Sequence, residues 1–261
     1  MKFFLAPMQG LTGYIVRNAF HHHFDYIDKY YTPFIPAAKR MNAKIKRDID
    51  PVNNEGITLI PQAMSIVADE VIDLHKQLAP YGYDEINVNL GCPSGTVVSK
   101  KRGSGILAYP DMLDSFLDEL YTKADFPVSI KTRVGFNDDE LWPELIEIYS
   151  KYPISELTVH PRVQKDFYKN TPRLDDFALA VQKINPDKTI LCYNGDITDT
   201  GSFKALTDRF PDIDEIMVGR GLFANPALIA ELKGVHMDKA ELRERLKNWH
   251  DEILSGYLSI F

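Results

Sequence analysis

The chain has few cysteines and tryptophans, two of each among 261 residues. Without an export signal, Cys92 and Cys192 are expected to be free thiols rather than a disulfide framework. No apolar run approaches the roughly 18 residues that span a bilayer, and the apolar start at 3–6 is ended by Pro7. Basic residues are outnumbered 30 to 37, which excludes a protein that coats nucleic acid through overall positive charge. We therefore expect a cytoplasmic protein without membrane contact, in which any contact with nucleic acid is a local patch.

Short apolar or β-branched runs recur at fairly even intervals and predict eight strands. They are residues 2–6, 29–35, 58–63, 85–89, 128–132, 156–160, 189–194 and 215–219. Apolar residues at helical spacing lie between most of them, as in Val71, Leu74 and Leu78. Strands that alternate with helices about every 30 residues are typical of a (β/α)8 TIM barrel, an α/β fold. A doubly wound open sheet is the alternative.

Helix signals complete the predicted organisation. Asn137 with Glu140, and Asp238 with Glu241, resemble capping boxes. The polar segment 36–57 is expected to be a loop. The barrel is predicted to occupy residues 1–234, and residues 235–261 to add a short C-terminal helical extension. The run of three histidines at 21–23 is not expected to bind a metal, because consecutive side chains on a helix point in different directions.

Polar residues follow nearly every predicted strand at its carboxyl end, where barrels collect their reactive groups. In chain order they are Pro7 and Met8; Gln62; Asn89 and Cys92; Lys131 and Arg133; His160 and Arg162; Asn194, Gly195 and Asp196; and Gly219, Arg220 and Gly221. We expect them to meet at one mouth of the barrel.

The last two groups predict a phosphate site. Gly195 and the turn at 219–221 let backbone N–H groups approach an anion. A helix expected to begin near Asn225 would add the positive end of its dipole. Phosphate sites after strands seven and eight are frequent in barrels, so a phosphorylated cofactor or substrate is expected.

Four other residues favour binding of a planar, anionic heterocycle. Lys131 interrupts an apolar run, where an unpaired ammonium is costly to bury, so it needs an anionic partner or must reach the barrel end. Gln62 and Asn89 offer paired donor and acceptor groups. His160 is interpreted either as part of this site or as a hydrogen-bonded core histidine.

Cys92 lies in a turn, Gly91-Cys92-Pro93, that directs its thiol away from the preceding strand. A thiol of ordinary pKa is protonated at neutral pH and can act as a proton donor. As a nucleophile it would need a base or a lowered pKa. Cys192 lies inside a predicted strand and is interpreted as a small buried hydrophobe.

Taken together, these motifs resemble the tRNA-dihydrouridine synthases, which are enzymes that use flavin mononucleotide (FMN). The matching blocks are Ala6-Pro7-Met8, Pro61-Gln62-Ala63, the segment 87–93 with Gly103-Ser104-Gly105, the segment 129–133, the segment 158–162, the segment 194–197 and the segment 218–221.

The resemblance implies a role for each matched residue. Pro7, Met8, Gln62, Lys131 and His160 would contact the flavin, and Asn194, Gly195, Asp196, Gly219 and Arg220 would lie around its phosphate. Cys92 would protonate the uracil ring, while Asn89 and Arg162 would place the base. NAD(P)H would reduce the flavin, and tRNA would be the substrate, with no metal involved.

Two features depart from that family. Its usual C-terminal helical domain grips tRNA, whereas here a single helix follows the barrel, a shortened remnant of that domain. Contact with RNA is left to local basic clusters, either Lys100-Lys101-Arg102 in the Cys92 loop or Lys39-Arg40 with Lys44, Lys46 and Arg47. Two alternatives stay open: an FMN enzyme acting on a free pyrimidine, like the dihydroorotate dehydrogenases, and a non-catalytic RNA-binding barrel.

Overall fold

The computed structural model describes residues 1–37 and 40–260. Contacts divide these residues into two compact units. Unit 1 contains the described residues of Met1–Pro33, Asn42–Ile60 and Asp196–Phe261, and unit 2 those of Phe34–Met41 and Pro61–Gly195. Each unit pairs parallel strands with helices.

Unit 1 contains four parallel strands in the order β10, β1, β2, β4. Their bounds are β1 Lys2–Leu5, β2 Lys29–Tyr31, β4 Leu59–Ile60 and β10 Glu215–Val218. Its helices are α1 Tyr14–His23, α2 Ala43–Ile49, the 3-10 helix η1 Pro51–Asn53, α8 Thr200–Arg209, α9 Arg220–Ala224, α10 Leu228–Leu232 and α11 Lys239–Leu258. The strand side chains Phe4 and Tyr31 are fully buried and their ring centroids lie 6.3 Å apart.

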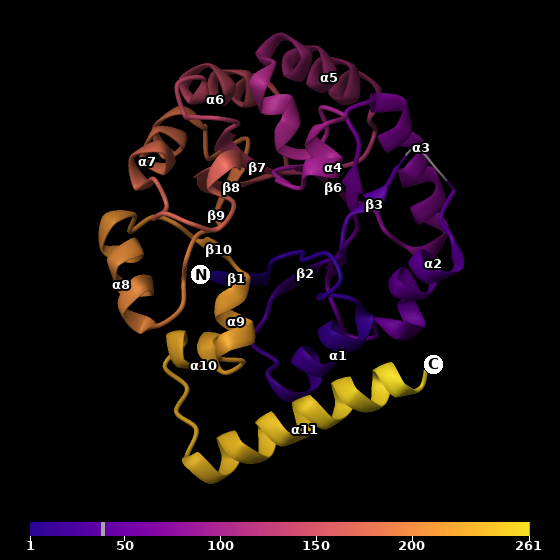
Figure 1. Cartoon of the computed structure of the whole chain (residues 1–261), viewed down its shortest axis with the longest axis vertical. Coiled ribbons are helices and arrows are strands. Elements are labelled where there is room, and N and C mark those ends of the chain that lie inside the picture. The colour runs from indigo at the N-terminus through magenta and orange to yellow at the C-terminus, as the bar shows by residue number, and fades with distance from the viewer. Residues whose placement is uncertain (38–39, 261) are drawn as a thin grey trace. The chain divides into compact units, whose positions relative to one another are not determined.

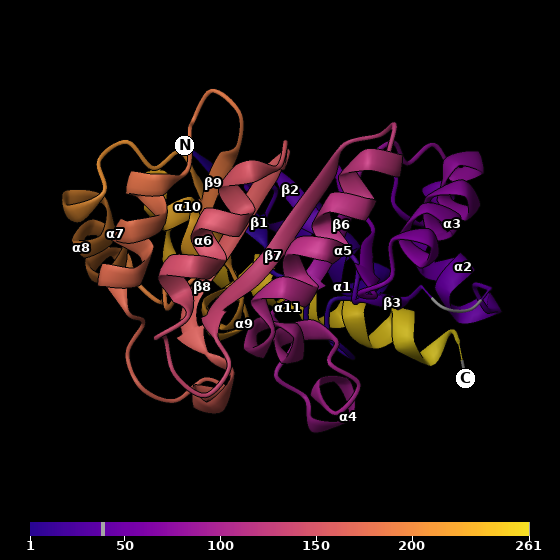
Figure 2. The ribbon, with the colours of Figure 1, turned by 90° about the horizontal axis from the view of Figure 1, so that it is seen from above.

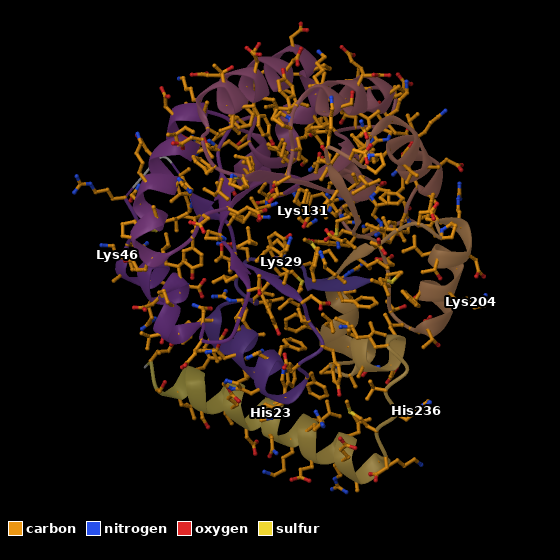
Figure 3. All side chains as sticks on the ribbon, turned by 180° about the vertical axis from the view of Figure 1, so that it is seen from behind. His23, Lys29, Lys46, Lys131, Lys204 and His236 are labelled. Atoms are coloured by element: carbon orange, nitrogen blue, oxygen red, sulfur yellow. The ribbon has the colours of Figure 1, made fainter. Side chains whose placement is uncertain are left out.

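Helix α11 lies along α1 within unit 1 (Figure 1). The Trp249 ring meets Phe20 with 5.3 Å between centroids. Glu252 makes ring-nitrogen contacts of 2.9 Å with His22 and 2.8 Å with His23, the latter labelled in Figure 3. The predicted C-terminal helix is confirmed, with Asp238 as its N-cap. Two residues of the histidine run thus hold the C-terminal helix to α1.

Unit 2 contains six parallel strands in the order β3, β5, β6, β7, β8, β9. Their bounds are β3 Ile35–Pro36, β5 Gln62–Met64, β6 Ile86–Leu90, β7 Val128–Gly135, β8 Glu156–Val163 and β9 Ile190–Tyr193. The helices are α3 Ala68–Leu78, α4 Gly95–Val98, α5 Pro110–Lys123, α6 Trp142–Lys151 and α7 Leu174–Lys183, with 3-10 helices η2 Ala79–Tyr81, η3 Gly103–Ala108 and η4 Gln164–Asp166. Figure 2 shows β7 beside α5 and α6.

The two faces of β7 have different surroundings, and successive side chains along a strand point to opposite faces. Thr132 bonds the Tyr149 hydroxyl of α6 at 2.9 Å, so its face packs against the helices. Ser129, Lys131 and Arg133 therefore point to the opposite face. Figure 3 labels Lys131 on the side of the strands away from α5 and α6. This polar face of β7 carries Ser129, Lys131 and Arg133.

All eight predicted strand positions contain strand, but two of them are divided. The expected strand 29–35 consists of β2 and β3, and 58–63 consists of β4 and β5. Pro33 and Pro61 lie at the two breaks, where a residue without an N–H cannot continue the hydrogen-bond ladder. Both breaks coincide with boundaries between the units. Within residues 1–37 and 40–260, ten strands therefore replace the predicted eight.

Two local predictions were wrong. The segment 36–57 was expected to be a loop but contains α2 and η1. Asn42 caps α2 by accepting from Ile45 N at 3.0 Å, and Arg17 of α1 donates to the Asp48 carbonyl at 2.6 Å. Only Ile49 of α2 is buried, so no apolar period marked the helix. Asn137 is not a cap either.

Helix α6 begins instead at Trp142, with Leu141 at its N-cap. Pro143 occupies the first turn, where a missing N–H costs nothing. Across residues 1–37 and 40–260, no helix combines the length and apolarity needed to cross a membrane.

Candidate active site

A chain of amide hydrogen bonds crosses three neighbouring strands of unit 2. Asn89 Nδ2 donates to Gln62 Oε1 at 2.8 Å, and Gln62 Nε2 donates to Asn87 Oδ1 at 2.8 Å. Asn87 Nδ2 then donates to Ser129 Oγ at 3.0 Å. All four side chains are buried. The chain fixes the orientation of each amide, because every amide nitrogen in it donates and every amide oxygen accepts.

The Cys92 loop is held by its backbone. Asn89 Oδ1 accepts from Gly91 N at 3.1 Å and from Cys92 N at 2.9 Å. The Cys92 carbonyl accepts from Ser104 N at 3.1 Å and from Ser104 Oγ at 2.8 Å. Gly103, with φ of +55°, brings its chain so close that an added Cβ would lie 2.7 Å from the Cys92 carbonyl oxygen. The half-buried thiol is therefore carried on a fixed loop.

Arg133 connects the Cys92 loop to the loop after β8. Its Nε donates to the Gly91 carbonyl at 2.9 Å. Its two terminal nitrogens donate to the carbonyls of Val163 at 2.9 Å and Phe167 at 2.8 Å. The sequence prediction noted Arg133 only as a residue at a strand end and gave it no role. Its spacing of two from Lys131, which places both on one face of the strand, was the available signal.

Lys131 lies beside Asn89 on the neighbouring strand and donates from Nζ to Asn194 Oδ1 at 2.5 Å. Burial lowers its pKa to about 7, and the positive charge of Arg133 acts in the same direction. Burial raises the pKa of the Cys92 thiol above its ordinary value, opposed by a backbone hydrogen bond at Ser94 and by the charges of Arg133 and Lys131. The thiol is therefore neutral at physiological pH, and the lysine is close to its titration point.

His160 and Arg162 lie together on β8. An Arg162 terminal nitrogen lies 3.1 Å from His160 Nε2. Because a guanidinium can only donate, Nε2 must accept, so His160 is neutral with its proton on Nδ1. Arg162 also donates to the carbonyls of Lys169 at 3.0 Å and Asn170 at 2.5 Å. With 1% of its surface exposed, Arg162 holds the following loop. Its predicted contact with substrate stays a prediction.

The predicted basic patch at 100–102 is only partly open to solvent. Arg102 pairs with Glu70 at 3.1 Å. Lys101 Nζ lies 4.2 Å from the centroid of the Tyr109 ring, in a cation–π contact. Lys100 is exposed. Two of the three residues keep an accessible charge, and Arg102 mainly anchors the loop.

Of the second predicted cluster, Lys39 lies outside the described residues. Arg40 is exposed, as are Lys44, Lys46 and Arg47 around α2. Figure 3 shows Lys46 at the outer edge of its unit. Each of these four side chains is therefore solvated.

The residues expected around a phosphate fall in both units. In unit 2, Asn194 is engaged by Lys131, and Gly195 follows it at the end of β9. A Cβ at residue 195 would overlap the Tyr193 hydroxyl, so a larger residue would require the Tyr193 side chain to move. This position thus places a half-buried glycine next to the residue that Lys131 binds.

In unit 1, Arg220 donates to Asp196 Oδ1 at 2.6 Å, and Gly219 directly precedes α9. A helix begins near Asn225 as expected, namely α10 at Leu228, but another helix, α9, lies nearer to Gly219 in the chain. Helix α9 begins at Arg220 and ends at Ala224, because Asn225 adopts an extended C-cap conformation. The N–H groups of a first helical turn therefore follow Gly219 itself.

Met8 also belongs to the predicted site residues of unit 1. Its N–H donates to Thr12 Oγ1 at 2.9 Å, and its Sδ would lie 3.7 Å from a Cβ built on Gly219. Pro7 is half-buried immediately before it. The structure thus assembles Gln62, Asn89, Cys92, Lys131, His160, Arg162, Asn194 and Gly195 on unit 2, and Pro7, Met8, Asp196, Gly219 and Arg220 on unit 1.

Comparison with known proteins identifies the family. The model of the family described as dihydrouridine synthase matches residues 4–254. The chain belongs to the dihydrouridine synthase family. It is 27% identical over 272 aligned residues to a "Probable tRNA-dihydrouridine synthase" of Staphylococcus aureus (strain COL), covering 99% of this chain and 77% of that protein. It is 28% identical over 263 residues to the "Probable tRNA-dihydrouridine synthase 2" of Bacillus subtilis (strain 168), covering 96% and 78%.

Among solved structures, morphinone reductase matches with a TM-score of 0.60 at 12% identity, over 92% of this chain and 88% of that one. The similarity shows the fold alone, and it confirms the predicted TIM barrel against the open-sheet alternative. Dihydrouridine synthases are flavin-dependent oxidoreductases, so this family membership implies a flavin cofactor.

Proposed function

We propose that this dihydrouridine synthase reduces uridine to dihydrouridine in tRNA, with FMN as its flavin and NAD(P)H as the electron source. The observation that carries the proposal is the cluster of Cys92, Lys131 and Arg133, where a neutral thiol lies close to two basic side chains from the polar face of β7. Family membership supplies the substrate class. A uridine inside tRNA structure must leave its base stack to reach such a site.

The chemistry of the donor set suits a flavin. Its ring is planar, carries alternating donors and acceptors, and becomes anionic when reduced. Gln62 and Asn89 present oriented amides, His160 is a neutral imidazole, and Lys131 is bonded to the neutral amide of Asn194. Pro7 and Met8 would contact the ring as well. When bound, the reduced flavin supplies hydride to one carbon of the uracil double bond.

For a phosphate of FMN, unit 2 would offer Asn194 and the backbone at Gly195, and unit 1 would offer Arg220 and the backbone at Gly219. Asp196 already accepts from Arg220 at 2.6 Å, so it would orient that guanidinium. Lys131 would stabilise negative charge on the cofactor. Its pKa of about 7 in the absence of an anion reflects burial, and an anion beside it would favour the protonated form.

Cys92 provides the proton. Hydride addition at one carbon of the double bond leaves a pair of electrons at the other, and the Cys92 Sγ proton moves there to complete the saturated ring. Burial keeps the thiol protonated, which suits a general acid. Asn89 fixes the Cys92 backbone, while Arg162 would help place the base. Lys100, Lys101 and Arg102 would lie along the RNA backbone, in the cytoplasm where tRNA is found.

The test begins with a strain that lacks the gene. Its tRNA should contain less dihydrouridine by mass spectrometry, and a plasmid copy should restore the missing modification. Purified protein should bind FMN, oxidise NAD(P)H and convert uridine in tRNA from that strain. Conversion of free uridine or orotate at a higher kcat/KM than tRNA would instead support the free-pyrimidine alternative, and protein that binds tRNA but takes up no FMN would support the non-catalytic one.

A further inference from the structure

The loop after β8 presents two aromatic rings to solvent. Phe167 is 46% exposed and Tyr168 is 51% exposed. Exposed lysines, Lys165 and Lys169, lie on either side of the pair. The carboxylate of Asp166 is buried and forms an ion pair with Arg173. The accessible surface of this loop is therefore aromatic and positive, a combination that suits single-stranded nucleic acid.

The loop holds Phe167 in an unfavourable backbone conformation. Its φ is +52°, a region that bulky L-residues rarely adopt. The Phe167 N–H donates to the Gln164 carbonyl at 3.0 Å, while Arg133 donates to the Phe167 carbonyl at 2.8 Å. Arg162 donates to two carbonyls just beyond it. Two buried arginines thus fix a strained, exposed phenylalanine where glycine would cost less, and such strain gathers at functional sites.

The Arg133 guanidinium connects this loop to the loop that carries Cys92, the proposed proton donor. Arg133 binds the carbonyl of Gly91, which precedes Cys92, and the carbonyl of Phe167. The Tyr168 ring lies 6.4 Å from His160, centroid to centroid, and 5.6 Å from the Arg133 guanidinium carbon. Tyr168 thus borders the cluster of titratable groups. Phe167 comes one residue earlier on a loop fixed by the same arginine.

We propose that Phe167 stacks on an unpaired base next to the target uridine, with Lys165 and Lys169 contacting the phosphates beside it. This inference rests on the proposed function and extends it to the nucleotides that flank the target. An extruded uridine leaves its neighbours partly unstacked, and an aromatic ring can stack on any base regardless of its identity. The loop would therefore grip RNA without reading its sequence.

The decisive variants separate stacking from folding. Phe167→Gly removes the ring and relieves the positive φ, so Tm should stay the same or rise. The Kd for tRNA should increase about 5- to 100-fold, the range expected when one stacked base is lost. Phe167→Ala should weaken binding similarly, and Phe167→Trp should preserve it. Val181→Ala, at a position also 46% exposed but on α7, is the control and should change Kd less than twofold.

Binding is measured by fluorescence anisotropy with labelled tRNA, without turnover, and Tm by differential scanning fluorimetry. Phe167→Trp adds a direct signal, because stacking on a base should quench the added indole emission beyond the change seen in the wild type. An unchanged Kd in both Phe167→Gly and Phe167→Ala, or no added quenching, would overturn the stacking contact. A wild-type protein that forms dihydrouridine while these variants bind normally refutes only this inference. A wild-type protein that neither binds nor modifies tRNA refutes the proposed function itself.

Discussion

The thiol of Cys92 is suited to donating a proton rather than to nucleophilic attack. Burial raises its pKa, and this effect outweighs the opposing charges of Lys131 and Arg133. A nucleophilic cysteine needs the opposite shift. Of the two roles that the sequence left open for Cys92, its surroundings therefore favour the acid.

Replacement of Cys92 with Ala should lower the rate of uracil reduction about 10²- to 10⁴-fold, the usual contribution of a general acid. Flavin reduction by NAD(P)H should remain close to the wild-type rate, since it needs no proton from this thiol. In the wild-type enzyme, uracil reduction should stay constant through neutral pH and decline only in the alkaline range where the thiol ionises. Stopped-flow measurement of the two half-reactions from pH 6 to 10 tests both statements. Equal turnover of Cys92→Ala and wild type would contradict the acid role.

Lys131 should make stability depend on pH. Its folded-state pKa of about 7 lies below the value of about 10.4 for an exposed lysine. Between these pH values the unfolded chain binds more protons, so the free energy of unfolding rises with pH. Below pH 7 both states carry the proton, and the cost of burying the ammonium is constant.

In flavin-free protein, Lys131→Met should therefore raise Tm by a few degrees at pH 6 and by less at pH 9.5. Thermal unfolding at both pH values measures the difference, with Lys76→Met on the exposed face of α3 as the control. A gain in Tm that is the same at both pH values would show that Lys131 carries no buried charge.

Individual residues differed in how far the sequence could predict them. Lys131 was found because a charge inside an apolar strand needs a partner, and the structure places its Nζ on Asn194. Arg133 received no role, because a strand-end arginine looks like any solvated charge until its three carbonyl partners are known. Those partners come from two segments that lie far apart in the sequence, the loop after β6 and the end of β8 with the loop that follows it. Phe167 was missed as well, because its positive φ and its bond to Arg133 are visible only in the tertiary structure.

Strands and helices were predictable where a regular apolar period decides them. The helices α3, α5, α6, α7 and α8 follow such periods and are confirmed. Helix α2 was missed because it is held by Arg17 of α1, which binds the Asp48 side chain and carbonyl. A contact between two distant segments leaves no local pattern in the sequence. Pro33 and Pro61 were visible in the sequence and could have marked the two divided strands.

Two glycines, Gly103 and Gly95, can be compared to test whether the loop backbone positions the Cys92 thiol. At Gly103, φ is +55° and an added Cβ would lie 2.7 Å from the Cys92 carbonyl oxygen and 3.0 Å from its Cβ. At Gly95, the first residue of α4, an added Cβ would meet nothing within 4 Å. Gly103→Ala should lower the free energy of unfolding by about 1–3 kcal/mol and displace the thiol. Gly95→Ala should be neutral or stabilising by about 0.4–1 kcal/mol.

Urea unfolding and the rate of uracil reduction, measured for both variants, test this difference. We expect Gly103→Ala to lose kcat more than it raises the KM for tRNA, because it moves the proton donor and leaves RNA contacts in place. Equal kcat in the two variants would mean that the loop backbone does not position Cys92.

At the scale of the whole molecule, the predicted division at residue 234 stays a prediction. Within unit 1, helix α11 packs so closely on α1 that a Cβ on Gly256 would lie 2.6 Å from Ile15 Cγ2. Arg245 donates to the His23 carbonyl at 3.0 Å. The sequence indicated the helix through its period, but the identity of its partner required the tertiary structure.

The net charge of −7 opposes binding of a polyanion, so tRNA affinity must come from a few local cations. Lys100→Ala combined with Lys101→Ala should weaken binding and reduce the slope of log K against log salt by about 0.7–0.9 for each phosphate that is no longer neutralised. Arg102 stays unchanged because it pairs with Glu70. Lys76→Ala with Lys204→Ala is the control, since it alters the net charge equally at positions on α3 and α8. If the general field governed binding, both doubles would change the slope alike, whereas a local patch predicts a change only in the Lys100 and Lys101 double.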